Sequence, residues 1–591
     1  MDMLPEAFLV RMKALLKDDY EAFIRSYEIT NYKALRLNPL KADKAQFLAC
    51  MKRYEDVLEN DSGNDSGNES DEHRSNTDKN IRIDTAGGSS DKDDGIVEGA
   101  DDFLGEVTWE ENGFYYPDFL QPGKHPYHAA GVYYIQEPSA MYPVSLMGIE
   151  EPFDDLRILD LCASPGGKTT QIAGKMKDRG LLIANEIIPQ RASVLSENIE
   201  RMGISNTIVL NERPDHLKDI FIDYFDRILV DAPCSGEGMF KKNEQAVNEW
   251  SIENIKMCAV RQDEILDAAA DMLKPGGRLV YSTCTFSREE DEDRIERFII
   301  RHPEYRLIKQ EKLLPHEVKG EGQYAACLVR DSFRANHKEN ECSGDDKGIS
   351  AGEEGNEEVI NSFQDDKGIS DRGGSFLSSY SATGIQSSEK LKSFPEFIDF
   401  IRENLSDGMV SFFEGIELLH RPLIKYGDTL YLGPCYMPGI SGLKCLRPGL
   451  ELGTIKRGGS KSEARKSGNS KSGGSRPGAF KSGTYMPEAF KAGYTKSGAC
   501  CSGSSTAKKG RFEPSHALAL YLKPTDVKRH VNIDSIRERK LADDYLKGMT
   551  FEYTGDNGYY LICVDGYSIG WGKLAGNIMK NHYPKGLRVM W

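Results

Sequence analysis

The stretch Ile158-Leu159-Asp160-Leu161-Cys162-Ala163-Ser164-Pro165-Gly166-Gly167-Lys168-Thr169 decides the fold of this chain. Its apolar beginning predicts a buried strand, and the Pro-Gly-Gly run that follows predicts a tight turn. Helical spacing begins directly after the turn, so the segment is interpreted as strand, glycine turn and helix start. Gly166 and Gly167 permit a close approach of the backbone to a ligand.

Further apolar runs of strand length follow this unit, and amphipathic stretches of helix length separate them. They lie at residues 181–184, 207–210, 228–230 and 279–281. This alternation predicts parallel strands in a doubly wound α/β sheet. Ligands of such sheets bind at the carboxyl ends of the strands, which is where the distinctive motifs of this chain fall.

Two of those motifs contain a cysteine. Asp231-Ala232-Pro233-Cys234-Ser235-Gly236 follows one apolar run, and Ser282-Thr283-Cys284-Thr285 follows another. A lone cysteine is more often a buried apolar residue than a reactive one, but paired motifs at strand ends favour a reactive site. The sequence Ser287-Arg288-Glu289-Glu290 matches a capping box, which predicts a helix just after Cys284 with its N–H dipoles directed toward that loop. Such dipoles would favour the thiolate form of the cysteine.

Composition limits the class of protein. The 591 residues predict several domains. The net charge of −17 argues against a nucleic-acid partner, yet the acids concentrate in segments too poor in apolar residues to fold. Neither a run of about 18 apolar residues nor a basic-then-apolar leader is present, so a cytoplasmic protein is expected. The 12 cysteines are scattered, and neither a metal site nor a disulfide framework is indicated.

The glycine turn and the two cysteine motifs together resemble those of the RNA (cytosine-5) methyltransferases of the Sun/Nop family, and within it those acting on small-subunit ribosomal RNA. The resemblance covers most of the chain outside three low-complexity stretches. It implies a Rossmann-like S-adenosylmethionine-dependent methyltransferase core with an N-terminal RNA-binding module and a C-terminal PUA-like β domain. It also implies a monomer whose partner is small-subunit ribosomal RNA, naked or in an assembled subunit. A transfer RNA methyltransferase and a catalytically silent ribosome assembly factor remain alternatives.

The expected organisation has six parts. These are an N-terminal RNA-binding module (1–57), a disordered acidic insert (58–100), the catalytic domain (101–332), a disordered linker (333–392), an accessory RNA-binding domain (393–456 and 510–530) and the PUA-like domain (531–591). A Lys/Ser/Gly-rich insert, 457–509, splits the accessory domain. That insert either attracts phosphates without regard to sequence or is a soluble linker.

The resemblance also implies roles for the cysteines. Carbon 5 of cytosine is a poor nucleophile, so a thiolate must first add to carbon 6. By resemblance, Cys284 is that nucleophile, and Cys234 assists the later release. Asp231 would hydrogen-bond the cytosine edge near nitrogen 3 and would lie near the methyl-donor end of the cofactor.

The same resemblance implies the cofactor contacts. The turn would wrap the methionine end of S-adenosylmethionine; its residues are Cys162, Ala163, Ser164, Pro165, Gly166, Gly167 and Lys168. A phosphate loop is the rival interpretation, but it needs glycine in place of Cys162. Glu186 ends the next strand and is placed to accept both ribose hydroxyls. The adenine contact is open between the Asn211 side chain and the Arg213 backbone.

Several residues match family positions near the RNA channel. They are Arg36, Asn38, Tyr134, Gln136, Lys241 and Lys242. The alternative is that these are basic and aromatic surface residues without a specific role.

Overall fold

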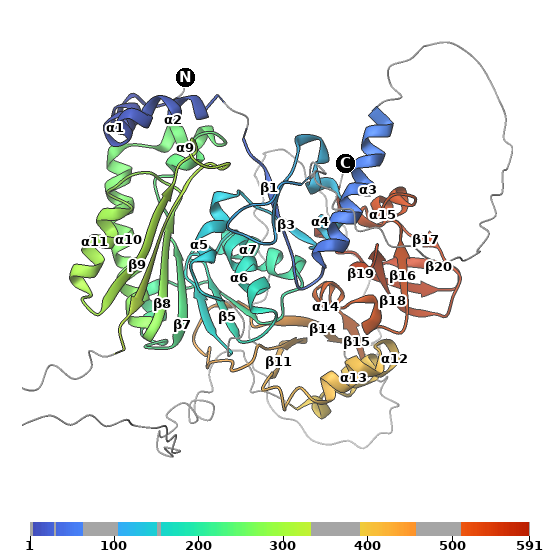
Figure 1. Cartoon of the computed structure of the whole chain (residues 1–591). Coiled ribbons are helices and arrows are strands. Elements are labelled where there is room, and N and C mark those ends of the chain that lie inside the picture. Colours follow the sequence, from blue (N-terminus) through green and yellow to red (C-terminus); the bar gives the residue numbers. More distant parts are fainter. Residues whose placement is uncertain are drawn as a thin grey trace, which may run out of the picture.

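The computed structural model of the chain describes residues 4–28, 31–62, 104–149, 155–332, 390–456 and 510–589 (Figure 1). Most of the predicted acidic insert, most of the linker and all of the Lys/Ser/Gly-rich insert lie outside the described residues. Among the described residues, no helix has the length and apolar character needed to cross a membrane.

The largest sheet has eight strands in the order β13-β6-β5-β4-β7-β8-β10-β9. Its strands are β4 (Arg157–Asp160), β5 (Leu181–Asn185), β6 (Thr207–Leu210), β7 (Phe225–Asp231), β8 (Leu273–Thr283), β9 (Tyr305–Leu313), β10 (Gln323–Arg330) and β13 (Cys445–Arg447). Strands β4 to β8 are parallel, as predicted. The chain runs outward from β4 to β6 and then returns to β7, so the strand order reverses between β4 and β7. Open α/β sheets bind ligands at such a reversal.

Apolar side chains cover both faces of this sheet. Alternate residues of one strand point to opposite sides, so Leu159 belongs to one core cluster and Ile158 to another. The main covering helices are α6 (Gly167–Met176), α7 (Pro189–Arg201), α8 (Pro214–Lys218), α10 (Ile252–Met272) and α11 (Glu292–Arg301). Burial on both faces explains why the strands are continuous apolar runs rather than alternating ones.

The N-terminal residues are tied to the catalytic region. Strand β1 (Ala34–Leu37) pairs with β2 (Gly113–Tyr115) and β3 (Tyr133–Ile135) in a three-stranded antiparallel sheet. Helices α1 (Glu6–Leu16) and α2 (Tyr20–Ser26) bury Phe8 and Phe23 against Trp250 and Phe286. Helix α3 (Lys44–Ser62) extends beyond residue 57. The expected boundaries at 57 and 101 therefore divide one sheet.

Two smaller sheets form the C-terminal part. The first contains β11 (Leu423–Tyr426), β12 (Thr429–Leu432), β14 (Leu450–Lys456) and β15 (Arg511–Pro514), with α12 (Pro395–Asn404), α13 (Asp407–Glu414) and α14 (His516–Tyr521). The second contains β16 (His530–Ile533), β17 (Phe551–Glu552), β18 (Gly558–Val564), β19 (Tyr567–Ala575) and β20 (Ile578–Asn581), with α15 (Arg539–Leu546). Strands β14 and β15 pair antiparallel across the insert. Between β12 and β14 the chain contributes β13 to the catalytic sheet, where it pairs with β6.

Candidate active site

The glycine turn connects β4 to α6 at the carboxyl end of the sheet. Gly166 has φ +111°, a conformation that side chains disfavour, and directly precedes α6. A Cβ on Gly167 would lie 3.4 Å from the Gln136 side chain, so β3 and the turn approach closely. A cavity of about 220 Å³ lies here, lined by Tyr134, Ile135, Gln136, Glu137, Ala140, Asp160, Cys162, Ala163, Ser164, Pro165, Gly167, Lys168 and Asp231. Most predicted turn residues thus share one cavity with Asp231.

Asp160 supplies an unpaired acceptor in the cavity wall. Its Oδ2 accepts a hydrogen bond from Thr169 Oγ1 at 2.6 Å, whereas its Oδ1 is buried without a partner. Burial raises the pKa of this carboxyl to about 7. A buried orphan acceptor fits a ligand that carries a donor or a positive charge, and S-adenosylmethionine carries both an ammonium and a sulfonium group. Sequence reasoning did not single out Asp160, although it ends the strand before the turn.

Asp231 joins the glycine turn to the cysteine motifs. Its Oδ2 lies 2.8 Å from Lys168 Nζ, and its Oδ1 accepts from Ser282 Oγ at 2.7 Å and from Gln323 Nε2 at 3.3 Å. Burial alone would lower the pKa of Lys168, but the Asp231 carboxylate outweighs it and raises that pKa. Asp231 is therefore held between β4's turn and β8. Ser282 and Gln323 were not predicted as site residues.

The two cysteines lie against each other. Cys234 Sγ and Cys284 Sγ are 3.2 Å apart. The hydrogen bond to Cys284, together with burial, raises the pKa of Cys234 well above its ordinary value. Cys234 is thus a thiol that can donate its S–H toward Cys284. The Gly238 N–H also donates to the Cys284 carbonyl at 2.8 Å, so the two loops are joined through the backbone.

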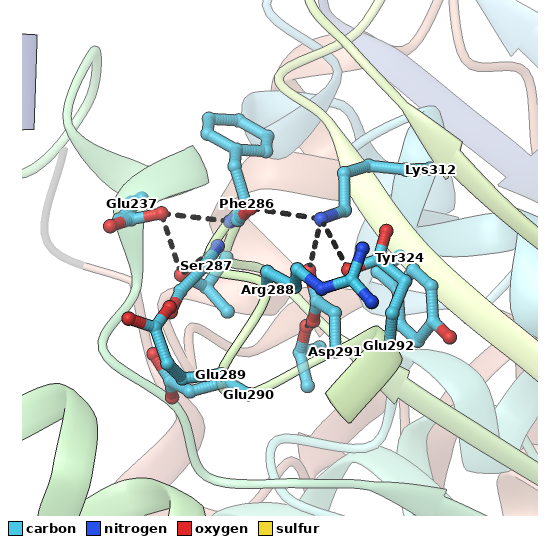
Figure 2. Close-up of polar contacts among 12 residues, drawn as sticks. Glu237, Phe286, Ser287, Arg288, Glu289, Glu290, Asp291, Glu292, Lys312 and Tyr324 are labelled. Atoms are coloured by element: carbon cyan, nitrogen blue, oxygen red, sulfur yellow. Dashed lines mark hydrogen bonds and ion pairs between the residues drawn. The ribbon is translucent and has the colours of Figure 1, made fainter. Parts of the chain in front are cut away.

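The predicted capping box at residues 287–290 is wrong. Helix α11 begins at Glu292, several residues later, and its N-cap residue Asp291 makes no side-chain capping bond. Glu289 and Glu290 make tertiary contacts instead. Figure 2 shows the loop that contains them, which is held by contacts of Phe286 with Glu237 and Lys312. Glu289 pairs with Arg11 at 2.6 Å, and Glu290 accepts from the Ser235 backbone N–H at 2.9 Å.

Two buried carboxyl groups, those of Glu237 and Glu290, hold the two cysteine loops through hydrogen bonds. Glu237 accepts from the Phe286 N–H at 2.9 Å (Figure 2) and from Trp250 Nε1 at 3.0 Å. Glu290 Oε2 accepts from Gln262 Nε2 at 3.0 Å and from the Ser235 N–H, and its Oε1 makes a hydrogen bond with Ser235 Oγ. Sequence reasoning missed both residues, because a glutamate next to a cysteine motif gives no signal of burial.

Glu186 lies at the end of β5 and is 3 % exposed. Its Oε1 accepts from the Ile188 N–H at 2.9 Å, and its Oε2 lies 3.5 Å from Arg191. Asn211 donates its amide to the backbone carbonyls of Glu186 at 2.7 Å and Ile187 at 2.9 Å. Asn211 therefore holds the Glu186 turn in place, and the ribose contact of Glu186 stays a prediction.

Arg213 does not point into the site. Its side chain is 72 % exposed and pairs with Asp215 at 2.9 Å. Any contact with adenine would therefore have to come from its backbone. Strand β13 covers this edge instead, because the Asn211 N–H donates to the Lys444 carbonyl at 2.8 Å.

The structure corrects the expected RNA contacts of Arg36 and Asn38, which are 1 % and 2 % exposed. Arg36 donates to the Gly167 carbonyl at 3.0 Å and to Thr170 Oγ1 at 2.7 Å, so it holds the glycine turn. Asn38 donates to the carbonyls of Gly131 and Met202.

The other residues expected near the RNA channel also make contacts within the chain. Gln136 accepts from Arg36 Nε at 3.0 Å, and Tyr134 lines the cavity. Lys241 donates to the Ser26 carbonyl at 2.9 Å, and Lys242 pairs with Glu321 at 2.7 Å. Lys241 thus joins the catalytic domain to the N-terminal helices, whereas Lys242 pairs within the catalytic domain. The predicted RNA contacts of both lysines are untested.

Comparisons with known proteins agree with this architecture. A family model described as 16S rRNA methyltransferase RsmB/F matches residues 147–335. Models described as the N-terminal domain of 16S rRNA methyltransferase RsmF, the RsmF rRNA methyltransferase first C-terminal domain and the methyltransferase RsmF PUA domain match residues 4–64 with 70–138, 410–459 and 537–589.

Relatives carry related names. The chain is 33 % identical over 306 residues to ribosomal RNA small subunit methyltransferase F of Klebsiella pneumoniae, covering 51 % of this chain and 54 % of that one. It is 45 % identical over 192 residues to the protein of the same name from Vibrio cholerae, covering 32 % and 40 %. The matched region thus spans about half the length of these relatives, or less. A crystal structure of NSun6 from Pyrococcus horikoshii with SFG is 20 % identical, with a TM-score of 0.41, covering 56 % of this chain and 98 % of that one.

The four family models follow one another from residue 4 to residue 589, in the order of the sheets described above. Residues 147–335 therefore match the family described as 16S rRNA methyltransferase RsmB/F, and models of RsmF domains match the residues before and after them.

Proposed function

We propose that the protein is an S-adenosylmethionine-dependent RNA methyltransferase that forms 5-methylcytosine in small-subunit ribosomal RNA through a covalent cysteine–cytosine adduct. One observation carries this proposal: two thiols 3.2 Å apart lie in loops that begin at Asp231 and Ser282, beside the cavity of the glycine turn. The family match and the names of the relatives support ribosomal RNA as the substrate.

The residues around the cavity fit the cofactor. When bound, S-adenosylmethionine supplies an electrophilic methyl group. The glycine turn would hold its methionine end, and the orphan Oδ1 of Asp160 would accept a hydrogen bond from its ammonium group. Glu186 would accept the ribose hydroxyls. Asp231 already orients its carboxylate through Lys168 and Ser282.

The thiol pair divides the reaction into addition and elimination. The Cys284 thiolate would form a bond to carbon 6 of cytosine, which places electron density on carbon 5 for methylation. Carbon 5 would then take the methyl group from the sulfonium of the cofactor and pass its proton to water, and the electrons of that C–H bond would expel Cys284 from carbon 6. Cys234 is close enough to assist this release, since its S–H and Cys284 are already in hydrogen-bond contact. Asp231 would bind the cytosine edge near nitrogen 3.

Methyl transfer to RNA tests the proposal. The purified protein is incubated with labelled S-adenosylmethionine and, in parallel, with small-subunit ribosomal RNA, assembled small subunits and transfer RNA. We expect 5-methylcytosine in ribosomal RNA, loss of that product in Cys284→Ala, and full activity in the control Cys435→Ala, which replaces a partly exposed thiol in the C-terminal region. Product in transfer RNA alone would support the other substrate, and no product in any RNA would support an assembly factor without catalysis. Bisulfite sequencing of ribosomal RNA from cells with and without the protein then locates the modified base.

A further inference from the structure

Four polar side chains next to the two cysteines form a chain of hydrogen bonds. Ser235 Oγ lies 2.9 Å from Thr285 Oγ1, and Thr285 Oγ1 lies 2.9 Å from Glu237 Oε2. At the other end, Ser235 Oγ makes a hydrogen bond with Glu290 Oε1. All four residues are buried. Ser235 follows Cys234 and Thr285 follows Cys284, so the chain connects the two cysteine loops directly.

Counting hydrogens shows that this chain needs one more proton than its hydroxyl groups supply. It has three contacts, whereas Ser235 and Thr285 provide one hydroxyl hydrogen each. An ionised carboxylate can only accept. If both Glu237 and Glu290 were ionised, one of the three oxygen pairs would meet without a hydrogen between them, and a buried contact of that kind is costly.

The remaining contacts of the two carboxyl groups supply no hydrogen to the chain. The Ser235 N–H and Gln262 Nε2 donate to Glu290 Oε2, and Trp250 Nε1 donates to Glu237 Oε1. Each of these donors meets an oxygen outside the chain. The Phe286 N–H donates to Glu237 Oε2, so it supplies no hydrogen to the Ser235–Thr285 contact.

The surrounding charges favour Glu290 as the site of the extra proton. Burial raises the pKa of Glu290 to about 7, and it also raises the pKa of Glu237. Arg11 is the cation that faces the pair, and it is bonded to Glu289. Its charge partly opposes the effect of burial on the pKa of Glu237. The other titratable groups that face Glu290 are Cys234, Cys258 and Tyr281. Within the described ranges, neither Glu237 nor Glu290 forms an ion pair.

We propose that Glu290 holds a proton that completes the chain Glu290–Ser235–Thr285–Glu237, and that this proton locks the Cys234 loop to the Cys284 loop. Glu290 is thereby a positioning residue for the thiol pair. The lock itself follows from the hydrogen count, and only its effect on catalysis rests on the proposed function.

The sign of the pH dependence follows from the direction of the shift. A carboxyl whose pKa is raised on folding stabilises the protein fully below its ordinary pKa, and this contribution is lost as the pH rises through the folded value. For Glu290 the window runs from 4.5 to about 7. At pH 8 the ionised form outweighs the protonated form by about tenfold. The lock therefore opens on the alkaline side, where thiolate formation alone would favour a faster reaction.

Glu290→Gln is the decisive variant. A glutamine can accept from the Ser235 N–H and Gln262 with its oxygen and donate to Ser235 Oγ with its nitrogen, which reproduces the protonated glutamic acid at every pH. The matched control is Glu289→Gln, because the neighbouring Glu289 pairs with Arg11, which lowers its pKa to about 2. A third variant, Thr285→Val, removes the central hydroxyl of the chain.

Melting temperature and methyl-transfer rate are measured on the full chain from pH 5.5 to 8.5. We expect the melting temperature of Glu290→Gln, measured relative to that of the wild type, to rise by about 5 °C between pH 5.5 and 8.5. Glu289→Gln should show no such rise, and Thr285→Val, which breaks the chain of hydrogen bonds, should lower the melting temperature at pH 5.5. The rate of the wild type should fall about fivefold between pH 7 and 8 relative to that of Glu290→Gln, because the protonated fraction of Glu290 falls from about one half to about one tenth.

A Glu290→Gln variant whose melting temperature does not rise relative to that of the wild type between these pH values would overturn the proposal, because it would show that ionisation of Glu290 costs no stability. The melting data decide this even if no RNA is methylated. A failure of the proposed function and a failure of the lock are therefore separate results.

Discussion

Replacing Arg36 by methionine is expected to release the glycine turn from the N-terminal sheet. Arg36 donates hydrogen bonds to Gln136, to the Gly167 carbonyl and to Thr170 while fully buried, and methionine retains most of its apolar volume. A hydrogen bond from a charged donor contributes roughly 1.5–3 kcal/mol, so the three bonds of Arg36 together contribute about 6 kcal/mol. Burial lowers the pKa of Arg36 to about 10, which means that burying its charge costs about 3 kcal/mol. The methionine variant avoids this cost, so it offsets part of the loss of the hydrogen bonds. We therefore expect a net local destabilisation of about 3 kcal/mol.

Hydrogen exchange measures this loss where it occurs. A decrease of about 3 kcal/mol in the free energy of local opening corresponds to roughly a hundredfold faster exchange of the α6 amides. The control is Arg297→Ala, which removes an exposed arginine from α11. If the α6 amides of Arg36→Met exchanged within twofold of the wild-type rate, Arg36 would not hold the turn, and its interpretation as an RNA contact would regain support.

Three further predictions concern cofactor and chain organisation. Glu186→Ala should weaken S-adenosylmethionine binding by calorimetry, whereas an unchanged affinity would remove Glu186 from the ribose site. Asp231→Asn should lose the ion pair with Lys168 and lower the methyl-transfer rate by at least tenfold, with near-normal cofactor affinity, while wild-type rates would exclude a catalytic role. Deleting residues 63–94, which begin just after α3, should leave the melting temperature unchanged because their composition offers almost no apolar surface; a large decrease would show that they pack.

The fold of the catalytic core was predictable because its signal is local. Each central strand is a continuous apolar run, and the strand ends place Asp231, Cys234 and Cys284 at one edge of the sheet. The Rossmann-like core and the resemblance to this family are confirmed. Strand β13 could not be foreseen, because it has three residues and joins the sheet at β6 from more than 200 residues away.

Burial of polar residues limited the prediction of the site. A sequence does not distinguish a buried Arg36 from an exposed one, so Arg36 was placed near the RNA channel or on the surface without a specific role, and its contact with the glycine turn was missed. The sequence at 287–290 matches the capping pattern, but Glu289 and Glu290 bond to Arg11 and to Ser235 instead of to a helix end. Tertiary partners overrode a local rule in both cases.

The fate of the RNA in Cys234→Ser tests the central claim most directly. If Cys284 attacks and Cys234 releases, this variant should accumulate a protein–RNA adduct that survives denaturing electrophoresis and requires S-adenosylmethionine. The adduct should be absent from the double variant with Cys284→Ala. An adduct that persists without Cys284 and requires Cys234 would reverse the two roles, and full activity of both single variants without any adduct would contradict the paired-cysteine mechanism.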